Sequence, residues 1–185
     1  MKRNYWPLLF IGIFSFTFGM IVWTIMSAVK LPVNEDESFL KSYQDVDVNY
    51  NKMMYSNKSF NEKYELKLVI NSKEFGLTTE DIKYSQRVLE KKSKHKDVLK
   101  KGDNNLSLKI IDKKTNEVKN AEVTLKVTKS STSKLDIILL TKDFINQNDN
   151  LVTKFNLPEE NNWNITGSFE IDGEIGYIYI KTNAI

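Results

Sequence analysis

The chain has no cysteine and only one histidine, His95, among its 185 residues. Without cysteine there is no disulfide framework, no thiolate metal site and no lipid attached through an N-terminal thiol, so an exported domain must rely on an apolar core. His95 lies in the lysine-rich run 91–96, whose ammonium groups oppose both its protonation and cation binding. We expect a surface histidine there, and a Ser-His-acid catalytic set cannot be assembled without it.

Glycine, methionine and net charge exclude further classes of protein. The seven glycines are scattered and form no phosphate-binding loop. Only Met53 and Met54 lie outside the start and the N-terminal apolar run, far in sequence from His95, so we expect no metal and no cofactor. Beyond the N-terminal tail, 25 basic residues balance 24 acidic ones, which excludes the concentrated positive field of a nucleic-acid surface. We therefore predict a non-enzymatic protein without a small-molecule substrate.

The most informative feature is an uncharged run from Leu8 to Val29. A helix of this length rises about 33 Å, enough to cross the roughly 30 Å hydrocarbon core of a bilayer. Its hydroxyl side chains can bond back to the preceding helical turn, and its tyrosine and tryptophans suit the two interfaces. These residues are Ser15, Thr17, Thr24 and Ser27, and Tyr5, Trp6 and Trp23. The run predicts a transmembrane helix over residues 8–29.

A retained anchor is favoured over a cleaved signal peptide, which remains the alternative. The apolar run is longer than a signal requires, and cleavage after Ala28 would place Met26 where a small residue is needed. Lys2 and Arg3 precede the helix, whereas an acidic cluster at 35–37 follows it. By the positive-inside rule, residues 1–7 form a cytoplasmic tail and the large C-terminal part lies outside. No second run of this length occurs, so we expect a single-pass membrane protein.

A heptad stripe follows the predicted span. Asn34 is a candidate cap, and apolar residues then recur at spacings of four and three. The stripe consists of Phe39, Tyr43, Val46, Tyr50 and Met53, and after a break at Asn57 it resumes at Phe60 and Tyr64. We expect an amphipathic juxtamembrane helix, or stalk, over residues 34–61. Its stripe either packs on the chain's own globular domain or forms a seam against another membrane protein or a second copy.

From Tyr64 onward the apolar residues alternate as they do in half-buried strands. Seven such runs, separated by turn signals such as Asp172-Gly173, predict an all-β immunoglobulin-like antiparallel sandwich over residues 62–185. The expected inward positions are 64, 66, 68 and 70; 106, 108 and 110; 121, 123, 125 and 127; 135, 137 and 139; 151, 153, 155 and 157; 163, 165, 167, 169 and 171; and 175, 177 and 179. Residues 78–89 fit a helix or a strand, and we expect residues 90–101 to form a solvated basic loop.

Short motifs recur along this layout: Tyr5-Trp6-Pro7 before the span, Trp23 near its end, and Pro32-Val33 before an acidic, aromatic segment. The outer part contains three more: Gly102 to Leu108, Ala121-Glu122-Val123-Thr124-Leu125 and Trp163-Asn164-Ile165-Thr166-Gly167. In these motifs and their order the chain resembles the FixH/CcoH family, with an outer domain similar to the YtkA-like sandwiches. The glycine of the family's juxtamembrane motif is missing from residues 37–42.

The resemblance implies a single-pass protein of the bacterial inner (cytoplasmic) membrane, with its C-terminal domain in the periplasm, that assists assembly or stability of cbb3-type cytochrome c oxidase. It would dock on oxidase subunits through the spanning helix and the stalk. The span offers a small-residue surface on which membrane helices can pack. The partner-binding residues expected from these considerations are Gly12, Ser15, Gly19, Trp23, Phe39, Tyr43, Val46 and Tyr50. The alternatives are a periplasmic copper-delivery protein and a membrane-anchored adhesion or secretion accessory module.

Overall fold

The computed structural model describes residues 5–30, 37–38, 41–42, 49–78, 94–130 and 132–185. The chain divides into two compact units, Met1–Asn34 and Glu35–Ile185, which are described separately. The first unit contains one helix, α1 (Trp6–Lys30), which includes the whole predicted span. This helix is long and apolar enough to cross a membrane, so the expectation of an N-terminal apolar helix is confirmed.

The second unit begins differently from the predicted stalk. Helix α3 spans Tyr50–Lys63, and two short strands, β1 (Glu37–Ser38) and β2 (Lys41–Ser42), pair antiparallel before it. The prediction of helix is therefore wrong for these four residues. The heptad spacing in this region includes aromatic residues, which are also favoured in extended backbone. The sequence pattern alone cannot decide between helix and strand here, because that choice depends on tertiary packing. Residues 34–36, 39–40 and 43–48 of the predicted stalk lie outside the described residues.

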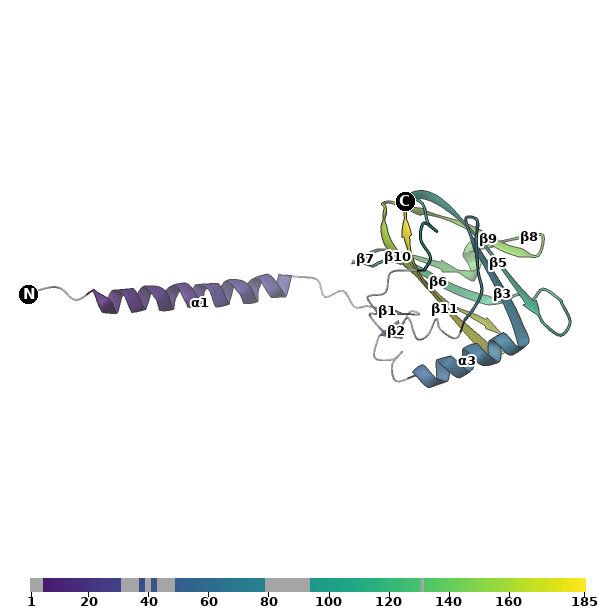
Figure 1. Ribbon diagram of the computed structural model, residues 1–185, viewed down its shortest axis with the longest axis horizontal. Coiled ribbons are helices and arrows are strands. Elements are labelled where there is room, and N and C mark those ends of the chain that lie inside the picture. The colour runs from purple at the N-terminus through teal and green to yellow at the C-terminus, as the bar shows by residue number, and fades with distance from the viewer. Residues whose placement is uncertain (1–4, 31–36, 39–40, 43–48, 79–93, 131) are drawn as a thin grey trace, which may run out of the picture. The chain divides into compact units, whose positions relative to one another are not determined.

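Two antiparallel sheets follow α3 and pack face to face as a β-sandwich (Figure 1). One sheet has the order β4-β3-β5-β9-β8 and the other the order β11-β10-β6-β7. The first sheet contains β3 (Tyr64–Ile70), β4 (Lys73–Phe75), β5 (Gly102–Asp112), β8 (Ile145–Gln147) and β9 (Asn150–Leu157). The second contains β6 (Glu122–Lys129), β7 (Thr132–Leu140), β10 (Asn161–Ile171) and β11 (Glu174–Ala184).

The strand order is that of an immunoglobulin-like sandwich. Strands β3, β5 and β9 take the places of strands A, B and E, and β6, β10 and β11 take those of C, F and G. Strand β7 extends the second sheet as an added C′ strand and is joined to β8 by a 3-10 turn, η1 (Thr141–Asp143). The predicted fold class is confirmed, and all seven predicted strands are present. Strands β4 and β8 were not predicted, because three residues are too few to show alternation.

The core lies between the two sheets, and most of the predicted inward positions are buried in it. Trp163, Ile165 and Phe169 of β10 face Leu106, Leu108 and other apolar side chains of the opposite sheet within one continuous cluster. Gly167 lies opposite Leu125 of β6. A Cβ atom at Gly167 would come within 2.5 Å of the Thr124 carbonyl oxygen and 2.3 Å of Leu125 Cδ2. The close approach of β6 to β10 therefore requires glycine at this position.

The predicted phase is wrong in the last strand. In β11 the residues that face the sandwich core are Ile178, Ile180 and Ala184, whereas Ile175, Tyr177 and Tyr179 lie on the opposite face. Both faces of β11 are apolar because helix α3 packs on its outer side (Figure 1). Alternation cannot choose between two apolar faces.

The expectation of a solvated basic loop is wrong for the end of residues 90–101. Val98 and Leu99 are buried in the main core, and Leu99 forms a parallel bridge with Ala184. Two apolar residues inside a lysine-rich run are too few to give a period, so the sequence pattern did not reveal this short extended segment. Residues 79–89, where helix and strand were both left open, and residues 90–93 of the predicted loop lie outside the described residues.

Candidate functional site

The first candidate surface is the apolar helix α1. It contains 25 residues, about 37 Å at the standard helical rise, and its side chains are exposed within its own unit. Thr17 donates its hydroxyl to the Ile13 carbonyl at 2.9 Å, and Thr24 donates to the Met20 carbonyl at 2.8 Å. Both hydroxyls are thereby satisfied within the helix, as the sequence predicted, and neither needs water inside a membrane.

The four predicted partner-binding residues of α1 share one face of the helix. Gly12, Ser15, Gly19 and Trp23 are spaced by three, four and four residues, which places them in one row. Among the described residues, apart from each glycine's chain neighbours and the nearby backbone of α1 itself, no atom lies within 4 Å of the position that a Cβ would take at Gly12 or Gly19, and Trp23 is 63 % exposed. Another helix can approach this row closely, because the two glycines leave its backbone uncovered.

The predicted stripe is only partly described. Phe39, Tyr43 and Val46 lie outside the described residues, so their role as partner contacts stays a prediction. Tyr50, the first residue of α3, is half-buried and packs on a small cluster formed by Met53 and Tyr177. From Tyr50 onward the stripe therefore contacts the chain's own domain, which is the first of the two interpretations that the sequence left open.

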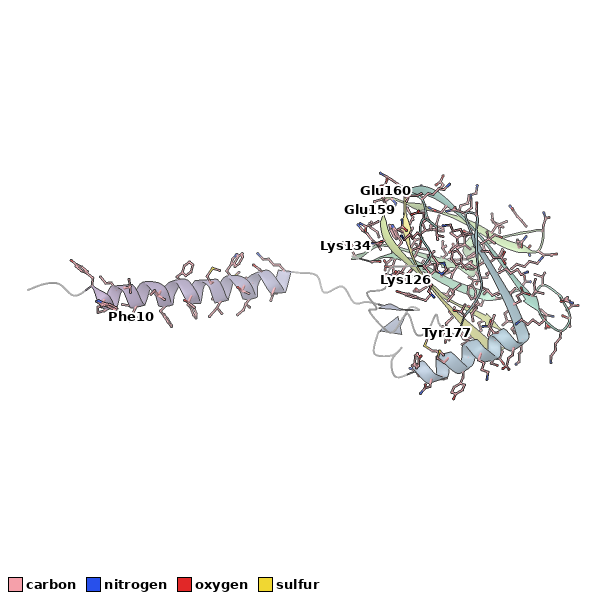
Figure 2. All side chains as sticks on the ribbon, viewed as in Figure 1. Phe10, Lys126, Lys134, Glu159, Glu160 and Tyr177 are labelled. Carbon is pink, nitrogen blue, oxygen red and sulfur yellow. The ribbon has the colours of Figure 1, made fainter. Side chains whose placement is uncertain are left out.

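Helix α3 is held on β11 by side-chain hydrogen bonds to the strand's backbone. Asn57 is fully buried; its Oδ1 accepts from the Tyr177 N–H at 2.6 Å and its Nδ2 donates to the Tyr177 carbonyl at 2.8 Å. The preceding residue, Ser56, donates its hydroxyl to the Ile175 carbonyl. Because β11 is the last strand of its sheet, these backbone groups have no neighbouring strand to pair with. Figure 2 labels Tyr177 at this junction.

The other end of the same edge is covered by the segment that contains Val98 and Leu99. Leu99 donates its N–H to the Asn183 carbonyl, and the Ile185 N–H donates back to the Leu99 carbonyl, at 3.3 and 3.2 Å. Asn104, which is fully buried, accepts from the Lys100 N–H at 2.8 Å and so fixes the segment to β5. Both ends of the β11 edge are thus closed by the chain itself, which protects the strand from pairing with another chain there.

A buried polar cluster lies on the outer face of the β11-β10-β6-β7 sheet. Lys126 is only 6 % exposed and forms a 2.9 Å ion pair with Asp136, whose carboxylate also accepts from the Thr128 hydroxyl. Thr166 lies directly opposite Lys126 in the register of β10 and β6, and it is 1 % exposed. The sequence analysis missed this cluster, because Lys126 between Leu125 and Val127 has the pattern of an ordinary solvent-facing residue.

The residues considered for copper do not form an open site in the described part of the chain. Met53 is 2 % exposed and packs against Tyr177, and the His95 ring lies edge-on to Phe75 with ring centroids 5.1 Å apart. Burial, followed by the charges of Lys94 and Lys73, lowers the pKa of His95 below its ordinary value. No group of three His, Cys, Asp or Glu side chains suited to a metal ion occurs among the described residues.

Comparisons with known proteins add no relative to these observations. No protein-family model matches the chain, and no curated protein matches it.

Proposed function

We propose that this chain is a non-enzymatic docking protein of the bacterial inner membrane that assists assembly or stability of a cbb3-type cytochrome c oxidase. In this proposal α1 is both anchor and binding element, with a cytoplasmic tail before it and the sandwich in the periplasm. The observation that carries the proposal is the uncovered row of Gly12, Ser15, Gly19 and Trp23 on α1. A helix that served only as an anchor would need apolar length but no surface suited to close helix packing.

The outer domain supports the proposal through the segments that carry the family resemblance. The Ala121 to Leu125 segment begins β6 and the Trp163 to Gly167 segment belongs to β10, and the two strands pair with Gly167 opposite Leu125. The glycine that ends the second motif is the residue that this pairing requires. The two motifs therefore describe one packed unit of the sandwich, as expected if the resemblance reflects a shared fold.

Replacing α1 provides the test. In a bacterium that carries the gene, deletion is expected to lower cbb3 oxidase activity and the levels of its subunits, and the full chain is expected to restore both. A chain in which residues 6–30 are replaced by an unrelated spanning helix should reach the membrane but fail to restore them. Unchanged oxidase activity and subunit levels after deletion would refute the proposed function, and full rescue by the replaced helix would assign docking to the outer domain instead.

A different measurement distinguishes the docking protein from a copper-delivery protein. The purified full chain in detergent is titrated with copper(I) in competition with a chelator of known affinity. If the chain is a docking protein, we expect copper(I) to stay bound to the chelator, because Met53 is buried and His95 is separated from Met53 in the sequence. Tight binding at one copper per chain would favour the copper-delivery protein over the docking protein.

A further inference from the structure

Two buried oxygen atoms on the outer face of the β11-β10-β6-β7 sheet have no hydrogen-bond partner: Oδ1 of Asn164 and Oγ1 of Thr166. Both residues belong to β10 and are two positions apart, so their side chains emerge on the same side of the strand. Buried polar atoms are almost always paired with protein or with ordered water. Two orphaned atoms at successive positions on one face of a strand therefore indicate a ligand that pairs with both.

The neighbouring strand places charged and hydroxyl groups beside these two atoms. In the register of β10 and β6, Thr166 lies opposite Lys126 and Asn164 lies opposite Thr128. Lys126 and Thr128 both bond to the carboxylate of Asp136 on β7. The orphaned oxygens thus border a buried ammonium–carboxylate pair.

The charges around the two atoms select the chemistry of the ligand. A metal cation is disfavoured because the buried ammonium of Lys126 is adjacent. An anion is disfavoured because the Asn164 oxygen can only accept hydrogen bonds and the carboxylate of Asp136 is close by. A neutral molecule that donates two hydrogen bonds and accepts one matches the two orphaned oxygens and the adjacent ammonium, and the smallest such molecule is water.

We propose that an ordered internal water binds between β10 and β6, donating to Asn164 Oδ1 and Thr166 Oγ1 and accepting from the ammonium of Lys126. The water connects the buried ion pair to the central strand of the sheet. This inference goes beyond the docking proposal, because it concerns the sandwich alone and holds whether or not the chain acts on an oxidase.

The Thr166→Val substitution gives opposite results for a hydrated and a dry site. If Thr166 Oγ1 is dry, valine removes a buried polar atom without a partner and the urea midpoint of the full chain in detergent rises or stays unchanged. If a water is bound, valine removes one of its partners and the urea midpoint falls. We expect the fall. Thr182, 2 % exposed and bonded through its hydroxyl to the Asn183 carbonyl, is the matched buried threonine.

Two further measurements complete the test. In a double-mutant cycle with Lys126→Met, a bridging water predicts that the two midpoint shifts are less than additive, because either substitution already disrupts the same water. In the unsubstituted chain with methyl-labelled threonine, nuclear Overhauser effects from a long-lived water should reach the Thr166 methyl and not that of Thr182. A raised or unchanged midpoint for Thr166→Val, additive shifts, or a Thr166 methyl without a water signal would each overturn the proposal.

Discussion

The side-chain amide of Asn57 on α3 bonds to both backbone polar groups of Tyr177 on β11: its Oδ1 accepts from the Tyr177 N–H at 2.6 Å, and its Nδ2 donates to the Tyr177 carbonyl at 2.8 Å. One amide side chain thereby takes the place of a neighbouring strand at the edge of the sheet. Helix α3, which leads into the sandwich, is thus held on it by side-chain hydrogen bonds to the backbone of β11 as well as by the apolar contact of Met53 with Tyr177.

Replacing Asn57 by alanine should destabilise the domain strongly. The substitution removes the acceptor of the Tyr177 N–H and the donor to the Tyr177 carbonyl, and each such loss costs about 1–3 kcal/mol, so we expect a total near 3 kcal/mol. Urea unfolding of the full chain in detergent, followed by the fluorescence of buried Trp163, measures the change. Asn51→Ala on the exposed side of the same helix is the control and should change stability by less than about 0.5 kcal/mol. Equal effects at the two positions would show that the paired edge contributes nothing.

The sequence predicted the sandwich well because its two sheets each bury one face. Leu66, Leu68 and Ile70 alternate with more exposed residues along β3, and this period of two is visible without any knowledge of the fold. The prediction failed where a second layer covers the strand. Tyr177 is buried against α3, so β11 shows apolar residues on both faces and the phase chosen from Ile175, Tyr177 and Tyr179 was the outer one.

The candidate site was predictable only in α1. The row of Gly12, Ser15 and Gly19 follows from helical spacing alone, because a membrane helix needs no tertiary partner to form. Asn57 looked like a break in an apolar stripe, and its role depends on a strand 120 residues further along the chain. Lys126 gave no signal for the same reason: its partner Asp136 belongs to another strand, and only strand pairing brings the two together.

Breaking the Lys126–Asp136 pair should cost far more than breaking an exposed pair. Lys126→Met leaves a carboxylate that is 13 % exposed without its cation, and removing one partner of a buried pair costs about 3–5 kcal/mol. The matched control is Lys119→Met, which removes the 3.1 Å pair with exposed Glu117 and should cost below about 1 kcal/mol. Both are measured by urea unfolding. The double variant Lys126→Met with Asp136→Leu should recover most of the loss, and a double variant no more stable than Lys126→Met would contradict this account.

Stability should fall on mild acidification because of His95. Its pKa is lowered in the folded state, chiefly by burial, so the unfolded chain binds the proton more tightly than the folded chain does. Protonation of His95 therefore favours unfolding as the pH falls through its ordinary pKa of 6.5 and on down to its lower pKa in the folded state. Above about pH 7.5 the imidazole is neutral in both states, and the His95 contribution to stability is fully present. The urea midpoint is compared at pH 7.5 and 5.5 for the unsubstituted chain and for His95→Gln. The variant should lose less stability over this interval, and an identical loss in both would exclude His95 as the titrating group.

If the chain docks on an oxidase through α1 as proposed, enlarging the glycines of α1 should impair docking without affecting membrane insertion. Gly12→Leu and Gly19→Leu place bulky side chains in the row that includes Ser15 and Trp23, so a partner helix can no longer approach the backbone closely. The amount of oxidase subunits recovered with the purified chain should therefore fall roughly tenfold. Ile21→Leu, about half a turn from Gly12 and Gly19, is the matched control and should leave recovery unchanged. Membrane fractionation checks that all variants insert, as apolar substitutions in a spanning helix should. If the leucine variants recover as much oxidase as the control, the row is not a packing surface and α1 serves as an anchor alone.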